Sequence, residues 1–362
     1  MHFIRFLKLP TTATASHKSK TAASSSPGTV TISALITIST DLSESFFPGN
    51  ASLRATLRAD NGSRQLLASK SLSWTSGMRN LPVTLTYTPS AKDAPSLGIF
   101  CVSATENRAD DMRGLFAKAT ETRILSAWST PFNIIENGGK AEALVERKLQ
   151  LSAGRMIRIW EETREDIARH IWPGGLAISS YLSTLPSPPT GALTTLTTLL
   201  SKPHLQVLEL GAGCGLAGIA LHTLLPSSSV AVTDLPITAE ITTRNLSLLA
   251  EKDGDTGGSG GITYAPLDWA EPLPDWCAAT TYDLILVADC TYNTASIPYL
   301  VSVLEQLYSS SPGVMVLLAH KVRHESEEMF FELAREKGLE KKEQVVFEIA
   351  GDTVDLYVIG SS

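Results

Sequence analysis

The chain has 362 residues, of which 43% are hydrophobic and 19% are charged, and its formal net charge is −7 with a pI near 5.6. A chain of this length and composition can bury the cores of two domains, which excludes a globally disordered protein. The acidic balance argues against a general nucleic-acid binder, because such proteins carry a basic surface. The sequence lacks the apolar run of about 18 residues that a transmembrane helix needs.

The first 28 residues contain Arg5, Lys8, Lys18 and Lys20, many Ser and Thr, and no acidic residue. This composition fits a mitochondrial transit peptide in part. The alternative, which we favour, is a short strand followed by a flexible Ser/Thr/Ala stretch that ends at Gly28. We therefore assign residues 1–28 as a flexible N-terminal segment and expect a cytoplasmic protein, with the nucleus as a further location.

Residues 29–139 show the alternation of apolar and polar side chains that is typical of half-buried strands. The expected strands cover residues 30–38, 53–59, 83–87, 97–102 and 122–128. Asn61-Gly62 follows the second of them and predicts a hairpin turn. The segment therefore predicts a small all-β, sandwich-like accessory domain that ends at Gly138-Gly139. Its role is recognition or support, and the pattern does not choose between them.

Residues 140–362 change to an α/β pattern. A hairpin is expected within residues 147–160, and Pro173 favours the start of a helix. Strands at 205–210, 229–234, 262–267, 283–289 and 313–319 alternate with helices at 216–225, 236–250, 294–309 and 324–337, and continuous apolar strands of this kind are typical of a parallel sheet. The short turn at residues 350–352 makes the last two strands, 344–349 and 353–359, an antiparallel hairpin.

A glycine-rich turn follows the strand at 205–210. It reads Glu209-Leu-Gly-Ala-Gly-Cys-Gly215, with Ala212 between the first two glycines, Gly211 and Gly213. Glycine lets the backbone turn tightly and approach a ligand, and the N–H groups that begin the next helix point at the same place. The turn is not the dinucleotide fingerprint, because position 216 is leucine. Its spacing is Glu-x-Gly-x-Gly-x-Gly.

Further ligand-type residues follow the neighbouring strands. Asp234 ends the second strand, where a carboxylate can accept both hydroxyls of a ribose, and Leu235 follows it. After the third strand, Asp268 could accept an adenine amino proton and Trp269 could pack on the purine. Because parallel sheets bind ligands at the carboxyl ends of their strands, we expect these residues to gather at one edge.

The four cysteines and the histidines do not predict a metal site. Cys101, Cys214, Cys277 and Cys290 include no pair at C-x-x-C spacing, and no further ligand stands near His320 and His324. We expect reduced thiols in an intracellular protein.

The glycine turn resembles motif I of the seven-strand methyltransferases that use S-adenosyl-L-methionine (SAM). The wider set resembles methyltransferase family 16, the lysine methyltransferases with an Asp-x-x-Tyr motif after the fourth strand. The resemblance covers about residues 145–360. It rests on Ile171-Trp172, Glu209–Gly218, Thr233-Asp234, Leu267–Trp269 and Asp289-Cys-Thr-Tyr292. It implies a Rossmann-like seven-strand sheet with a C-terminal antiparallel hairpin, and it assigns residues 140–362 to a SAM-dependent methyltransferase domain.

The resemblance also implies roles. Asp289 and Tyr292 would lie next to the transferred methyl group, Trp172 would close the site near the sulfonium, and the backbone of Ala288 would contact the cofactor. The cofactor-binding set is then Trp172, Glu209, Gly211, Ala212, Gly213, Gly215, Asp234, Leu235, Asp268, Trp269 and Ala288. Packing alone is the alternative for Trp172, Trp269 and Tyr292, and Glu209 either touches SAM or supports the loop. Two features depart from the family pattern: Pro-Gly-Gly follows Trp172, and the β domain is extra.

We therefore expect a SAM-dependent N-methyltransferase that acts on a lysine side chain of a protein, with a translation factor as the substrate class that the resemblance suggests. A small-molecule N-methyltransferase of the nicotinamide type and a non-catalytic SAM-binding scaffold stay open as alternatives. The intact glycines, Asp234 and the Asp289–Tyr292 pair argue against the scaffold. We expect a protein partner and neither membrane nor nucleic acid. The sequence does not indicate the oligomeric state, the target lysine or the number of methyl groups added.

Overall fold

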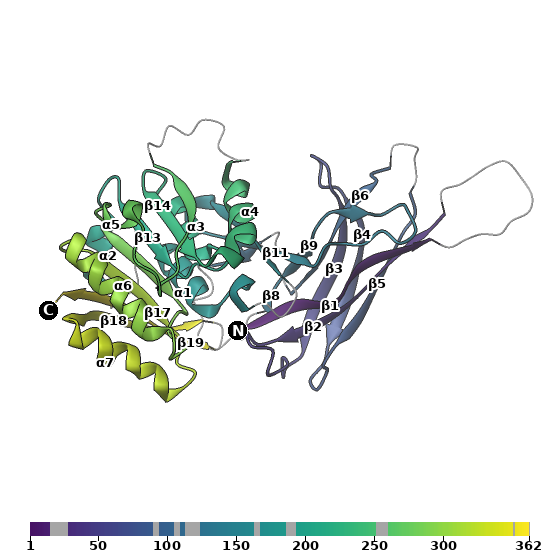
Figure 1. Cartoon of the computed structure of the whole chain (residues 1–362). Helices are drawn as coiled ribbons and strands as arrows, with labels where there is room; N and C mark the ends of the chain where they lie inside the picture. Colours follow the sequence, from purple (N-terminus) through teal and green to yellow (C-terminus); the bar gives the residue numbers. More distant parts are fainter. Residues whose placement is uncertain are drawn as a thin grey trace, which may run out of the picture. The chain divides into compact units, whose positions relative to one another are not determined.

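The computed structural model describes residues 1–14, 28–89, 94–104, 109–112, 124–162, 167–185, 193–250, 260–349 and 352–361. The chain divides into two compact units (Figure 1). The first comprises Met1–Asp110, Thr122–Lys148 and Trp160–Asp166, and the second comprises Asp111–Glu121, Leu149–Ile159 and Ile167–Ser362. We expected one boundary after residue 139, whereas the chain passes between the units within two paired strands, β11 (Leu144–Gln150) and β12 (Met156–Glu162).

Two sheets make up the β-rich part of the chain. The smaller has the order β5-β2-β1-β8, with strands at Leu81–Tyr87, Val30–Ser39, His2–Thr14 and Ile124–Leu125. The larger runs β12-β11-β9-β6-β3-β4, where β9 is Ala127–Ser129, β6 Leu97–Ser103, β3 Ala51–Ala59 and β4 Leu66–Trp74. The short strands β7 (Asp110–Asp111) and β10 (Phe132–Asn133) pair with β11 and β6.

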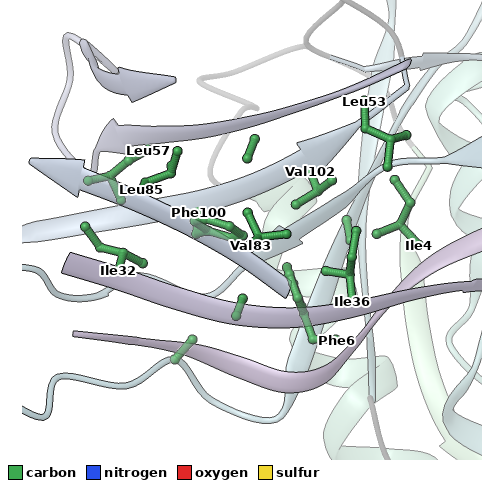
Figure 2. Close-up of a cluster of buried hydrophobic side chains, with 14 of the residues drawn as sticks. Ile4, Phe6, Ile32, Ile36, Leu53, Leu57, Val83, Leu85, Phe100 and Val102 are labelled. Carbon is green, nitrogen blue, oxygen red and sulfur yellow. The ribbon is translucent and has the colours of Figure 1, made fainter. Parts of the chain in front are cut away.

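Apolar side chains from both sheets form the core of the first unit (Figure 2). Ile32 and Ile36 of β2 and Val83 of β5 come from one sheet, and Leu57 of β3 and Phe100 of β6 come from the other, all of them buried. Ile32 and Ile36 are four residues apart and lie on the same face of β2, in keeping with the alternation seen in the sequence. The two sheets pack through such faces, which gives the expected β sandwich.

The expectation of a flexible segment at residues 1–28 is wrong for residues 2–14, which form β1, a strand of 13 residues. Phe3 and Ile4 are fully buried, and β1 pairs antiparallel with β2 between Phe3 and Thr14. The register shifts between Phe6 and Lys8 and again between Lys8 and Thr11. Such irregularities interrupt the two-residue period, which is why the sequence pattern indicated only a short strand. The expected linker from residue 15 to 27 lies outside the described residues.

The hairpin expected at Asn61-Gly62 does form, between β3 and β4, but its loop is longer than a two-residue turn. Its left-handed residue is Arg64, at φ 47°, rather than Gly62. The Asn61 side chain accepts hydrogen bonds from the backbone and the hydroxyl group of Ser63, and its backbone carbonyl accepts one from the Arg64 N–H. Asn61 thus shapes the loop through its side chain rather than through a tight Asn-Gly turn.

A seven-stranded sheet forms the centre of the second unit, with the order β15-β14-β13-β16-β17-β19-β18. The strands β13 (Gln206–Leu210), β14 (Ser229–Asp234), β15 (Ile262–Pro266), β16 (Leu284–Ala288) and β17 (Met315–His320) are parallel. The last two, β18 (Leu339–Ile349) and β19 (Asp352–Ser361), form the expected antiparallel hairpin. This part of the prediction is confirmed; the turn residues 350 and 351 lie outside the described part.

Helices cover both faces of this sheet (Figure 1). Within β13, Leu208 and Leu210 belong to the core cluster that includes α6 (Ile297–Ser310) and α7 (Met329–Glu336), whereas Glu209 bonds to α3 (Leu216–Leu224). Helix α1 (Pro173–Leu182) packs on α3 and is buried on all sides. The remaining helices are α2 (Thr194–Leu199), α4 (Ala239–Ala250) and α5 (Asp275–Ala278). No helix in the described part of the chain is long and apolar enough to cross a membrane.

The strand order changes direction at β13. The chain builds β13, β14 and β15 outward to one side, and then returns to place β16 and β17 on the other side of β13. In open α/β sheets, the carboxyl ends of the strands on either side of such a switch form the ligand site. Here these are the ends of β13 and β16, which are followed by the glycine turn and by Asp289.

Candidate active site

The glycine turn between β13 and α3 requires its glycines. Gly211, Gly213 and Gly215 all have positive φ, at 65°, 56° and 78°. A Cβ on Gly211 would lie 2.6 Å from the Cys290 Sγ and 3.0 Å from the Trp269 ring, and one on Gly213 would lie 2.8 Å from a backbone carbonyl oxygen. Backbone of this shape at a helix N-terminus can approach a ligand closely, as expected for the SAM loop.

Asp234 lies at the end of β14 and is joined to this turn. Its Oδ2 accepts a hydrogen bond from the Gly213 N–H at 2.6 Å, and its Oδ1 accepts one from the N–H of Leu235 at 2.6 Å. The Ala212 N–H in turn donates to the carbonyl of Thr233, just before Asp234. The carboxylate is thus fixed beside the loop, in the place where a ribose would be bound. Leu235 itself is exposed.

Trp269 and Asp268 follow β15. The Trp269 ring lies 3.0 Å from the position that a Cβ of Gly211 would take. It also packs against the core cluster on the α6 face of the sheet. Asp268 is exposed, and its Oδ1 accepts a hydrogen bond from the Ala270 N–H at 2.9 Å. The structure therefore brings Trp269 to the glycine turn, whereas Asp268 caps its own turn.

Glu209 is buried under the turn. Its Oε2 accepts a hydrogen bond from the Gly218 N–H of α3 at 2.9 Å, and its backbone carbonyl accepts one from the Thr233 hydroxyl. Burial, with the nearby Asp234 charge as a smaller cause, raises the pKa of Glu209 to about 8. Its carboxyl group thus holds β13 to α3, which favours loop support over cofactor contact.

This raised pKa has a consequence for stability. The folded chain keeps the Glu209 proton between pH 4.5 and about 8, while the unfolded chain loses it, so unfolding becomes easier as the pH rises through this window. Glu209→Gln keeps the hydrogen-bond acceptor and removes the titration. We expect the variant to gain on the order of 3 kcal/mol over the wild type between pH 5 and pH 8. Urea unfolding without SAM measures this, and parallel pH profiles for both proteins would contradict it.

The motif after β16 begins with an unusual backbone. Ala288 ends the strand, and Asp289 adopts φ 54°, in the left-handed region that non-glycine residues rarely occupy. The side chain of Asp289 is buried, whereas Tyr292, three residues on, is 55% exposed. The Asp289 side chain therefore faces inward, and the Tyr292 side chain is open to solvent.

Both oxygens of the Asp289 carboxylate have donors. Oδ2 accepts a hydrogen bond from the Gly174 N–H in the first turn of α1, and Oδ1 pairs with the Arg323 Nη1 at 3.0 Å. Pro173 begins α1, as expected, with Trp172 at its N-cap. The Trp172 indole donates to the carbonyl of Ile167 and lies 5.7 Å from the Arg323 guanidinium. Trp172, Asp289 and Arg323 therefore form one cluster.

Sequence reasoning missed Arg323 and His320. His320 ends β17, and its Nδ1 lies 2.8 Å from the hydroxyl of Thr291, inside the Asp-x-x-Tyr motif. Burial lowers the pKa of His320, so the ring is neutral at pH 7. His320 is the last residue of β17 and Arg323 follows three residues later; because β17 pairs with β16, the expected parallel sheet already placed both near the motif.

Cys290 is a structural thiol. It is buried, and its Sγ lies within hydrogen-bonding distance of the carbonyls of Leu210 and Ala288. Burial raises its pKa well above the ordinary value for a thiol. The group therefore stays protonated and packs against the glycine turn.

These residues fit SAM. The glycine turn has left-handed backbone at the start of α3, Asp234 offers an acceptor for the ribose, and Trp269 offers an aromatic ring beside Gly211. Asp289 and Tyr292 follow the end of β16, and Trp172 is the N-cap residue of α1. The arrangement can hold an activated methyl donor against a second, positioned molecule.

Comparison with known proteins gives a family match. The family model described as lysine methyltransferase matches residues 151–337. A UPF0665 family protein of Schizosaccharomyces pombe is 25% identical over 302 residues, covering 82% of this chain and 84% of that protein. Because of this coverage, the second match includes much of the β-rich region as well.

Further relatives match shorter parts of the chain and are named as lysine methyltransferases. The protein N-lysine methyltransferase METTL21A of Danio rerio is 35% identical over 132 residues, which cover 36% of this chain and 56% of that protein. EEF1A lysine methyltransferase 3 of Mus musculus is 27% identical over 170 residues, which cover 47% of this chain and 62% of that protein. The solved structure of a magnesium protoporphyrin IX methyltransferase from Synechocystis with bound SAM covers 52% of this chain and 79% of that one, at 15% identity and a TM-score of 0.37; a TM-score this low adds no argument.

Proposed function

The chain belongs to the lysine methyltransferase family, whose model matches more than half of its residues, and we propose that it transfers a methyl group from SAM to a lysine side chain of a protein. Membership makes it a SAM-dependent methyltransferase. The substrate and the roles of individual residues are the proposal.

One observation carries the proposal: the Asp289–Tyr292 motif follows β16, beside the glycine turn that follows β13. Asp289 is buried and hydrogen-bonded at both oxygens, whereas Tyr292 is exposed. A long, narrow side chain such as lysine can reach from an exposed aromatic residue to a buried carboxylate. The match to protein-lysine methyltransferases of other organisms supports the same substrate class.

The chemistry requires little from the protein beyond positioning. SAM supplies the methyl group on a sulfonium, and the acceptor nitrogen must be uncharged to attack it. A free lysine amine has a pKa of about 10.4, so its proton must leave to water before transfer. In our proposal Gly211, Gly213 and Asp234 hold the donor, Asp289 orients the amine, and the Tyr292 ring flanks the lysine chain.

We propose a translation factor as the substrate protein. The name of the mouse relative, EEF1A lysine methyltransferase 3, supports this class, and so do the exposed Tyr292 and the presence of a β-rich unit that the minimal methyltransferase does not need. A cytoplasmic location agrees with such a substrate and is part of the proposal.

The test is to incubate the purified protein with methyl-tritiated SAM and a cell extract, followed by gel fluorography. We expect a discrete labelled protein band, with at least about tenfold less label for Asp289→Ala because the amine loses its orienting group. Acid hydrolysis of the band should release methylated lysine.

Asp275→Ala is the matched control, because Asp275 is an exposed acid on α5, away from the motif. The control should label the band as the wild type does. Absence of any band, together with measurable SAM binding, would instead indicate a small-molecule acceptor such as nicotinamide or a non-catalytic scaffold, and full labelling by Asp289→Ala would remove Asp289 from the reaction.

A further inference from the structure

Arg323 is a charged residue beside Asp289 that no sequence motif indicated. It lies in the loop between β17 and α7, and its Nη1 is 3.0 Å from the Asp289 Oδ1. The Asp289 side chain is 4% exposed and that of Arg323 is 18% exposed. An ion pair this well buried is screened little by solvent, so each partner changes the electrostatics of the other.

The same guanidinium reaches the other residues expected around the acceptor. It lies 5.7 Å from the centre of the Trp172 ring, a cation–π distance, and its charge acts on the Tyr292 hydroxyl. Arg323 therefore contacts or influences all three residues that we expect next to the transferred methyl group.

The residues of this loop make further contacts around Arg323. Glu327, which is buried, accepts hydrogen bonds from the backbone N–H groups of Arg323 and His324. His320, at the start of the loop, contacts Thr291 of the Asp-x-x-Tyr motif at 2.8 Å. The guanidinium is thus placed by the loop as well as by its pairing with Asp289.

We propose that Arg323 is a positioning and specificity residue of the methyl-transfer site: it converts the Asp289 carboxylate into a neutral ion pair, so that the site holds an uncharged amine in preference to an ammonium ion. The inference rests on the function proposed above, transfer to a lysine amine.

The reason is the charge that a lone carboxylate would select. An unpaired Asp289 would attract the ammonium form of lysine, whose nitrogen has no lone pair for attack. With Arg323 in place, the positive charge of the guanidinium repels the lysine ammonium, so the site binds the ammonium form less well than the neutral amine. In the transfer, the nitrogen lone pair forms the new N–C bond and the S–C bond breaks with its electron pair on sulfur. The product is a methylated ammonium ion, and the one proton released is the one that lysine loses to water before the attack.

The other titratable groups around the pair decide which pH range is informative. They come from β14, from the motif after β16, from the end of β17 and from the following turn: Asp234, Cys290, Tyr292, His320 and Glu327. Burial lowers the pKa of His320 and raises those of Cys290 and Tyr292, so these three are uncharged from pH 7 to about 9. Burial also raises the pKa of Glu327, and a Glu327→Gln background removes its titration.

The experiment measures single-turnover methylation of the protein identified in the labelling experiment, at saturating concentration, from pH 7 to pH 10. The rate of the saturated complex reports the ionisation of the bound amine. For Arg323→Gln, which removes the charge and keeps a hydrogen-bond donor, we expect the acid limb of the pH–rate profile to move up by about one pH unit. The rate should then be roughly tenfold lower near pH 7.5, and the difference should shrink once the pH rises above the wild-type limb. Arg323→Lys should keep the wild-type limb.

Arg335→Met is the matched control, because Arg335 is an exposed arginine at the end of α7. SAM affinity and the thermal unfolding midpoint verify that each variant is folded, and Arg323→Met serves as a second neutral variant should Arg323→Gln fail to fold. A loss of the same factor at every pH, with the limb unmoved, would overturn the inference and leave the proposed function standing. A wild type that methylates no protein at any pH would overturn both.

Discussion

Asp234→Ala is expected to weaken SAM binding by at least about 100-fold. The Asp234 carboxylate holds the Gly213 N–H at 2.6 Å and lies where the ribose hydroxyls would bind. Hydrogen bonds to a charged group contribute about 1.5–3 kcal/mol each, and losing two of them corresponds to the stated factor. Isothermal titration calorimetry with SAM measures the change directly.

A second variant separates the charge from the support of the loop. Asp234→Asn keeps a carbonyl oxygen for the Gly213 N–H but replaces the other acceptor by a donor, so its affinity should fall between those of the wild type and Asp234→Ala. Asp275→Ala, at an exposed acid, should bind as the wild type does. A dissociation constant for Asp234→Ala within about threefold of the wild type would contradict the ribose role.

Arg147→Ala is expected to lower the free energy of unfolding of the first unit by about 3–5 kcal/mol. The Arg147 side chain is fully buried, its Nε donates to the Glu161 Oε1 at 2.7 Å, and its Nη1 donates to the carbonyl of Ser126 at 2.7 Å. Removing the cation takes the Arg147 guanidinium away from the buried Glu161 carboxylate. Because the chain has two units, urea unfolding should be followed by hydrogen exchange of peptides from β1 to β6 rather than by one global signal.

The double variant distinguishes the ion pair from packing. Arg147→Met combined with Glu161→Leu removes both charges and keeps the volume, and such replacements are often neutral, so its stability should return close to that of the wild type. Arg79→Ala, at an exposed arginine of the same unit, is the control. If Arg147→Ala costs less than about 1 kcal/mol, the buried pair does not hold the unit together.

The sequence predicts those features that depend on local pattern. The continuous apolar strands, the glycine spacing and the acid after β14 are each readable within one segment, and their order along the chain fixes the parallel sheet and its carboxyl edge. Pro173 likewise indicates the start of α1 on its own, because proline is tolerated in the first turn of a helix.

Features that depend on distant partners were not predictable in this way. Strand β1 is interrupted by register shifts, and β4 is an edge strand with mostly exposed side chains, so neither shows a clear two-residue period. Arg323 is 34 residues from Asp289, and an isolated arginine in a charged loop has no signature that distinguishes it from a solvated one. Only the pairing of β16 with β17 brings the two together.

The chain crosses from the first unit to the second within β11 and returns within β12. This determines when, during synthesis, the first unit can be completed. Glu161, the buried partner of Arg147, belongs to the first unit, yet it follows residues 149–159, which belong to the second. On a translating ribosome, the first unit therefore stays incomplete until residues 160–166 have left the exit tunnel, even though most of its strands emerge before residue 150. Until then, the Arg147 guanidinium lacks the Glu161 carboxylate, and the first unit is completed only by residues that follow a stretch of the second unit.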